Sequence, residues 1–96
     1  MYLKKIYFVY VLTNLTRSTL YIGVTNSLEK RMMQHQVSAA PSFTQKYKTF
    51  VLIYFECFEH AESAIAREKQ IKKWSRSKKE WLIAKVNPEW NEISFI

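Results

Sequence analysis

The sequence predicts an α/β fold in which a small three-stranded antiparallel sheet is flanked by about three helices. The chain has 96 residues, the size of one domain, so we expect residues 1–96 to form a single unit. Its hydrophobic content of 48% is sufficient for a packed core. β-Branched and aromatic runs alternate with segments of helical periodicity, in the order strand, strand, helix, strand, helix, helix.

The first two elements form a predicted antiparallel hairpin. Residues 6–12 (IYFVYVL) and 19–24 (TLYIGV) have strand composition, and the polar residues 13–18 connect them as a turn. Gly23, the only glycine of the chain, lies near the end of the second run. A glycine in a strand indicates a bulge or a close approach of another group to the backbone.

A first helix is predicted over residues 28–36. Asn26 or Thr25 is the expected N-cap, and Glu29 completes a capping-box pattern with Asn26. Residues 37–48 are expected to form a loop, because Pro41 is unfavourable within a helix.

The second half of the chain predicts one strand and two helices. The strand covers residues 50–55 (FVLIYF), and a longer helix covers residues 60–74. The last helix is expected to begin at Ser77, with a capping box to Glu80, and to stop near Asn87. The expected apolar face of the longer helix consists of Ala61, Ala64, Ile65 and Ile71.

Glu68 falls on this apolar face, since Ala64 and Ile71 lie four residues before it and three after it. A carboxylate that is desolvated there must be compensated by an opposite charge. The residues leave two alternatives open: Glu68 pairs with a nearby Arg or Lys, or it binds a cation.

Arg31 and His35 project from the same side of the first predicted helix, because they are four residues apart. The Arg31 guanidinium could bind a phosphate, and His35 could exchange a proton near neutral pH. The structural alternative is a surface arginine beside a partly exposed histidine. Tyr10 and Tyr21 lie on the two hairpin strands, where tyrosines are common packing residues.

The chain carries a formal charge of +7, which predicts a polyanionic partner such as nucleic acid. Seven cations lie within thirteen residues; they are Arg67, Lys69, Lys72, Lys73, Arg76, Lys78 and Lys79. This density favours phosphate contacts, although a solvated helix face is the ordinary alternative. There is no aspartate, so a metal cage of several aspartates is excluded.

The sequence gives no indication of a membrane span or a disulfide. The single cysteine, Cys57, cannot form an internal disulfide and fits a reducing compartment, so we expect a cytoplasmic protein. Cys57 is expected to be a buried small hydrophobe. No apolar run reaches the length of a transmembrane helix.

The ordered set of Tyr10, Tyr21, Arg31, His35 and Glu68 resembles the GIY-YIG nuclease superfamily, specifically its short single-domain bacterial members related to the N-terminal nuclease domain of the bacterial excinuclease. The second signature is intact as Tyr21-Ile22-Gly23, and ten residues separate Tyr10 from Tyr21. The first signature, Phe8-Val9-Tyr10, keeps the tyrosine but not the glycine. The resemblance covers residues 7–87 and implies the GIY-YIG fold.

By this resemblance, Glu68 is the only protein ligand of one Mg²⁺ or Mn²⁺ ion. Arg31 holds the scissile phosphate, Tyr10 or Tyr21 takes the proton from the attacking water, and His35 relays it. The expected nucleic-acid contacts are the seven cations of the basic segment together with Gly23, Tyr47 and Asn87.

The resemblance implies a Mg²⁺-dependent endonuclease that acts on nucleic acid, DNA rather than RNA, in DNA repair or recombination. The alternatives are a nucleic-acid-binding module with little catalysis and a protein-interaction domain. We expect no association with membranes. The sequence is compatible with a protein partner, and we expect a monomer or a weak dimer.

Overall fold

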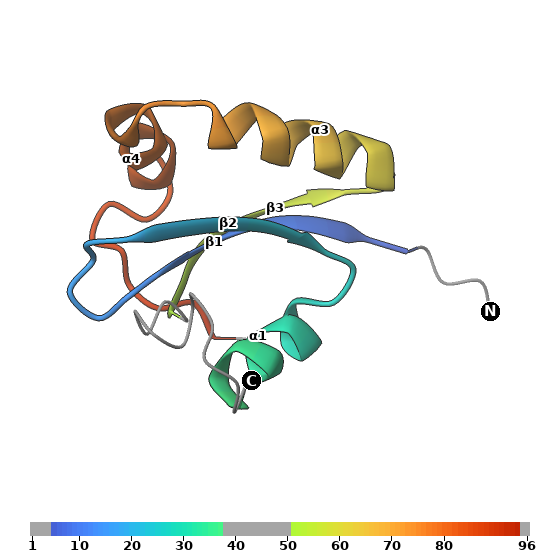
Figure 1. The fold of residues 1–96 in the computed structure, drawn as a ribbon, viewed down its shortest axis with the longest axis horizontal. Helices are drawn as coiled ribbons and strands as arrows, with labels where there is room; N and C mark the ends of the chain where they lie inside the picture. The colour runs from blue at the N-terminus through green and yellow to red at the C-terminus, as the bar shows by residue number, and fades with distance from the viewer. Residues whose placement is uncertain (1–4, 38–50, 95–96) are drawn as a thin grey trace.

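The computed structural model describes residues 5–37 and 51–94, with side chains omitted for residues 35–37. Figure 1 shows a twisted sheet with helices on both of its faces. The order of elements is the predicted one, so the expected fold class is confirmed. No helix within the two described ranges combines the length and apolar content that crossing a bilayer requires.

The sheet consists of β1 (Tyr7–Thr13), β2 (Leu20–Thr25) and β3 (Val51–Phe58) in the order β2-β1-β3. The central strand β1 pairs antiparallel with both neighbours, and Tyr10 lies directly opposite Gly23. Alternation of side chains along β1 therefore supplies two cores, because Val9 and Val11 face one side while Tyr10 and Leu12 face the other.

Helix α3 (Ala61–Lys72) and helix α4 (Arg76–Ala84) cover the Val9 side of the sheet. Their buried residues are Ala64, Ile71, Leu82 and Ile83. Ile65, which was expected on the apolar face of α3, is instead 42% exposed. The residues of α3 that face the sheet are Ala64 and Ile71, which lie on either side of Glu68 in the sequence. Ile65 lies beside this stripe.

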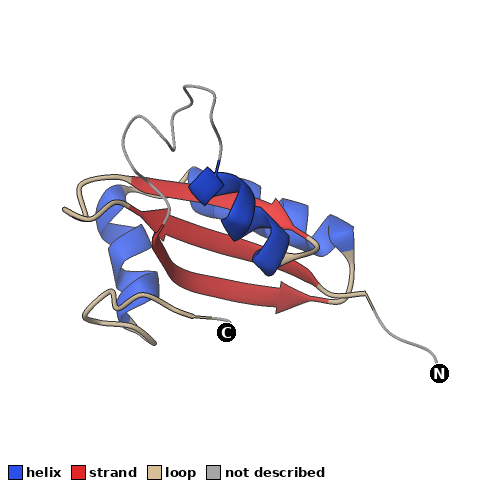
Figure 2. Cartoon of the chain, turned by 90° about the horizontal axis from the view of Figure 1, so that it is seen from below, coloured by secondary structure: helices blue, strands red, loops and turns tan. Residues whose placement is uncertain are grey.

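Helix α1 (Leu28–Val37) packs on the opposite face through Leu28 and Met32, which join the core of Tyr10 and Leu12. Figure 2, seen from the α1 side, shows this helix in front of the strands. Layers on both faces of a three-stranded sheet bury both sets of alternating residues, which explains why β1 is aromatic or aliphatic at every position before Thr13.

Both predicted helix caps were wrong by one or two residues. The backbone N–H of Lys30 donates to the Ser27 hydroxyl, so Ser27, and neither Asn26 nor Thr25, caps α1. The N-cap of α4 is Ser75, which accepts from the Lys78 N–H, and Ser77 lies inside the helix. In each case the hydroxyl reaches the N–H three residues later, which is the usual N-cap geometry.

Strand β3 extends beyond the predicted end at Phe55 to Phe58, and its Cys57 is exposed rather than buried. It also contains the bulge of the sheet. Val11 faces Tyr54 and Leu12 faces Leu52, so Ile53 is the extra residue. The predicted loop 37–48 begins with the last residue of α1, and its remainder lies outside the described residues.

Candidate nucleic-acid and catalytic site

Gly23 makes room for the Tyr10 ring. A Cβ built on Gly23 would lie 2.5 Å from the Tyr10 hydroxyl oxygen and 2.6 Å from its Cζ atom. Tyr10 is directly across the strand pair and is 0% exposed, so its ring lies over the glycine as part of the core. The close approach predicted for Gly23 is therefore confirmed, and the group that approaches is the tyrosine of the first signature.

Tyr10, Tyr21 and Arg31 are brought together on the α1 side of the sheet. The two tyrosine rings have centroids 6.1 Å apart and planes inclined by 36°. Burial raises the pKa of Tyr10, and the nearby Tyr21 raises it further, whereas the positive charge of Arg31 lowers it. Arg31 comes from the middle of α1 and Tyr21 from β2, and both are only partly buried. The cluster thus contains one buried phenol, one accessible phenol and one guanidinium.

Glu68 lies on the other face, on α3, and its side chain is 19% exposed. The ammonium of Lys72 is 3.3 Å from its Oε2 atom, so the structural alternative of an ion pair is realised. A partly accessible carboxylate oxygen is also the donor that Mg²⁺ prefers when it keeps most of its waters. Within residues 5–34 and 51–94, whose side chains the structure describes, no group of three or more His, Cys or Glu residues converges.

A surface pocket lies beside β2, the strand that carries Tyr21. It has a volume of about 330 Å³ and is lined by Leu20, Tyr21 and Ile22 of β2 and by Lys72 and Lys79 of α3 and α4. We call it the β2-edge pocket. β2 is an outer strand of the sheet, and the pocket borders both Tyr21 and Lys72, the ion-pair partner of Glu68.

The two arginines of the basic segment make internal contacts. Arg67 donates to both carboxylate oxygens of Glu56, from Nε at 2.8 Å and Nη2 at 3.0 Å. Arg76 donates to the backbone oxygens of Ser18 and Arg17 at 3.0 and 2.9 Å, which ties α4 to the β1–β2 turn. These guanidiniums are therefore occupied by contacts that hold the fold together.

The five lysines of the segment differ in their surroundings. Lys69 and Lys73 are exposed, while Lys72 and Lys79 line the β2-edge pocket. The Lys78 ammonium lies 4.3 Å from the centroid of the Trp74 ring, in a cation–π contact. The segment is thus a mixture of solvated lysines, pocket lysines and structural arginines.

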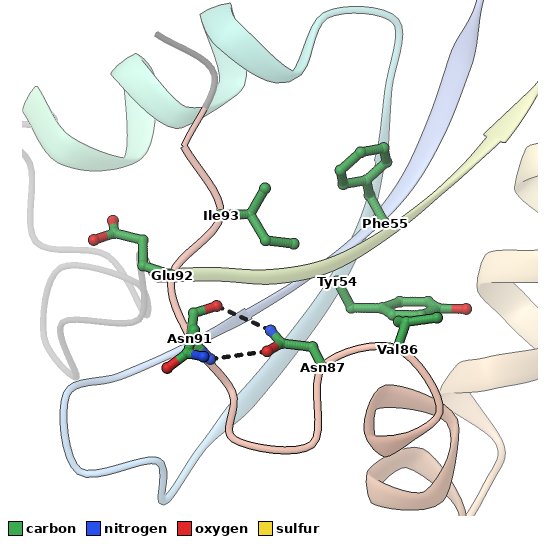
Figure 3. A pocket seen from close by; sticks show the side chains of 7 residues that line it. All are labelled: Tyr54, Phe55, Val86, Asn87, Asn91, Glu92 and Ile93. Carbon is green, nitrogen blue, oxygen red and sulfur yellow. Dashed lines mark hydrogen bonds between the residues drawn. The ribbon is translucent and has the colours of Figure 1, made fainter.

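Asn87 contacts β3, the strand at the edge of the sheet opposite β2. Its side-chain amide donates to the Ile53 backbone oxygen at 2.8 Å and to the Asn91 backbone oxygen at 2.9 Å. The Asn91 N–H returns a hydrogen bond to the Asn87 Oδ1 atom, as Figure 3 shows. Ile53 is the extra residue of the bulge, and Asn87 provides a hydrogen-bond donor for its carbonyl oxygen. The contacts of Asn87 are therefore structural.

The Figure 3 residues also line a second pocket of about 420 Å³, bordered by Tyr54, Phe55 and Ile93. Ile93 donates its N–H to the Leu52 oxygen at 2.8 Å, so the C-terminal segment runs along β3.

Two of the predicted site residues have no described side chain. Tyr47 lies outside the described residues, and the backbone of His35 is in α1 without a described side chain.

Glu56 is the centre of a polar cluster that the sequence did not predict. Its Oε2 atom accepts a hydrogen bond from the Tyr54 hydroxyl at 2.6 Å, and its carboxylate pairs with Arg67. A glutamate just after an apolar strand run was its only signal.

Known proteins are similar to this chain in sequence or in fold. The UPF0213 protein of Clostridium perfringens is 40% identical over 77 residues, covering 80% of this chain and 82% of that protein. A UPF0213 protein of Bacillus pumilus is 35% identical over 71 residues, covering 74% and 72%. The solution NMR structure of the UPF0213 protein BH0048 from Bacillus halodurans matches with a TM-score of 0.58 and 26% identity, covering 88% of this chain and 89% of that one. Residues 6–80 match the GIY-YIG catalytic domain. This match spans most of the chain, which therefore belongs to the GIY-YIG family.

Proposed function

We propose that this protein is a divalent-metal-dependent endonuclease that hydrolyses phosphodiester bonds of nucleic acid, with DNA as the preferred polymer. The observation that carries the proposal is that one residue from each of two groups lines the β2-edge pocket. Tyr21 borders the pocket and belongs to the cluster with Arg31, and Lys72 borders the same pocket and contacts Glu68. A backbone phosphate held there would border Tyr21 and Lys72, one residue of each group.

Among the two tyrosines, Tyr21 suits the role of general base better than Tyr10. Tyr10 is fully buried and its pKa is raised by that burial, so its phenol neither meets water nor ionises readily. Tyr21 is partly exposed beside the pocket. Tyr10 then acts as a positioning residue whose ring supports Tyr21 from below, at 6.1 Å between centroids.

Arg31 is assigned the phosphate oxygens. A guanidinium presents several N–H donors in one plane and remains charged at all relevant pH values, so it can hold a phosphate and stabilise the charge that develops during attack. Helix α1 fixes its position, because Leu28 and Met32 of the same helix are buried in the core.

Glu68 is assigned the metal ion, with water completing its coordination. Glu68 would hold a divalent cation, and that cation would supply positive charge to neutralise the phosphate and stabilise the leaving oxygen. The carboxylate is held on α3 by the buried residues on either side of it, Ala64 and Ile71, so its position relative to β2 is fixed.

The test is cleavage of single-stranded, flapped and branched DNA and RNA with and without Mg²⁺. Glu68→Gln and Arg31→Ala are expected to abolish cleavage, and Tyr21→Phe to lower kcat by about 10²–10⁴-fold. Glu62→Gln is the matched control for Glu68, because it is an exposed glutamate on the same helix. Lys30→Ala is the control for Arg31, because Lys30 is the exposed neighbour on α1.

The proposal fails if the wild-type protein cleaves none of these substrates, or if Glu68→Gln retains the activity of Glu62→Gln. Salt-sensitive binding of DNA without Mg²⁺-dependent turnover would instead identify a binding module that keeps the fold.

A further inference from the structure

Lys72 belongs to two features of the site at once. Its ammonium lies 3.3 Å from Glu68 Oε2, and its side chain lines the β2-edge pocket beside Tyr21 and Lys79. In the described part of the chain, it is the one residue that both contacts the Glu68 carboxylate and lines that pocket. The carboxylate assigned to the cation is therefore already paired with a lysine that also faces the substrate pocket.

This ion pair is well placed to be broken. Lys72 is 53% exposed, whereas Glu68 is 19% exposed, so the lysine can leave into solvent while the carboxylate stays in place. Pairs four residues apart on an accessible helix face contribute little to stability. A divalent cation carries twice the charge of an ammonium and repels it at short range, so the cation and the ammonium compete for the same oxygen.

The displaced ammonium has a destination within reach. A lysine side chain is a flexible four-carbon stem with a charge at its tip, and it binds phosphate as a point charge. Lys79 already places a second cation in the pocket, and Tyr21 borders it. A backbone phosphate in the pocket therefore gains a second cation when Lys72 turns away from Glu68.

We propose that Lys72 couples cation binding to phosphate binding: a divalent cation displaces its ammonium from Glu68, and the released ammonium binds a nucleic-acid backbone phosphate in the β2-edge pocket. The inference rests on the proposed function, because it takes Glu68 as the cation ligand. Thermodynamic linkage makes the effect reciprocal, so DNA must raise the affinity for the cation by the same factor as the cation raises the affinity for DNA.

The experiment measures binding rather than cleavage. Free Mn²⁺ is determined by electron paramagnetic resonance while the protein is titrated, with and without a short DNA hairpin. In the wild-type protein, DNA is expected to raise the Mn²⁺ affinity by about fivefold or more. Lys72→Met keeps the aliphatic stem but removes the charge, so it should raise the DNA-free affinity by about threefold. It should also reduce the further increase that DNA produces.

Two variants separate this inference from the function on which it rests. Lys79→Met removes a pocket cation that has no ion pair with Glu68 in the described chain, so it should weaken DNA binding and leave the DNA-free Mn²⁺ affinity unchanged. Glu68→Gln should abolish specific Mn²⁺ binding. If Glu68→Gln does so while Lys72→Met binds Mn²⁺ like the wild type, the coupling is refuted and the metal site stands. If Glu68→Gln binds Mn²⁺ normally, the metal assignment itself is refuted.

Discussion

Replacing Gly23 with alanine tests how tightly the first tyrosine is built into the sheet. The added Cβ would lie 2.5 Å from the hydroxyl oxygen, 2.6 Å from Cζ and 3.0 Å from Cε1 of Tyr10. These are atoms of a rigid ring, and Tyr10 is 0% exposed, so the ring cannot swing into solvent. The glycine does not have a positive φ angle, so the expected penalty is one of space and not of backbone conformation.

The magnitude follows from two opposing effects. Overpacking a core that has no free volume costs typically about 1–3 kcal/mol. Alanine restricts the unfolded chain more than glycine does, which offsets about 0.5–1 kcal/mol. We therefore expect Gly23→Ala to lower the free energy of unfolding by about 1–2 kcal/mol. For a domain of this size, each kcal/mol lowers Tm by about 4–8 °C.

The assay is urea unfolding followed by tryptophan fluorescence, in a double-mutant cycle with Tyr10→Leu. In the leucine background the ring is gone, so Gly23→Ala should be neutral or stabilising, and the difference between the two backgrounds gives the coupling free energy. An equal cost of Gly23→Ala in both backgrounds would show that the contact with Tyr10 is not the reason for the glycine.

Three further perturbations have defined outcomes. Asn87→Ala should lower the free energy of unfolding by about 1–3 kcal/mol, because the Ile53 carbonyl loses its partner, while DNA affinity measured by fluorescence anisotropy stays unchanged. Arg76→Lys should destabilise the fold by about 1 kcal/mol, because a lysine cannot reach both turn carbonyls, and an unchanged urea midpoint would contradict the clamp. Burial is the largest single effect on the pKa of Glu56 and raises it, but the hydrogen bonds from Arg67 and Tyr54 and the positive charges of Arg67 and Lys85 together outweigh burial, so the pKa lies below its ordinary value of 4.5. The resulting stabilisation is present above that value and disappears as the pH falls through the lower folded-state pKa, so Glu56→Gln should flatten the acid side of the stability–pH curve.

The sheet and its helices could be predicted because their signals are local. The apolar run of β1 reflects burial on both of its faces, and the three-to-four-residue spacing in α3 reflects burial on one face. Both patterns can be recognised in the order of residues along the chain. The caps were misplaced because several hydroxyl and amide side chains near each helix start could serve. Only the geometry selects Ser27 and Ser75.

Long-range partners account for what the sequence left open. Strand β3 continues to Phe58 past its apolar run because it stays paired with β1, and Arg67, eleven residues after Glu56 and on another element, neutralises the glutamate there. Spacing placed Glu68 toward the core but could not distinguish a salt bridge from a cation, and the structure pairs it with Lys72. The internal roles of Arg76 and of the Asn87 amide depend on residues 58 and 34 positions away, so no local pattern could reveal them.

The outer edges of the two outer strands, β2 and β3, differ in whether other residues cover them. The edge of β3 is covered where Ile93 donates to Leu52 and Asn87 to Ile53, while β2 has no further strand beside it in the described chain. An uncovered edge is a template for adding a strand from another molecule, and lysines beside such an edge discourage it. Lys72 and Lys79 stand at that edge, and a second copy approaching along β2 would bring four ammonium groups together. The same positive charge that suits a polyanion thus also protects the protein against edge-to-edge aggregation.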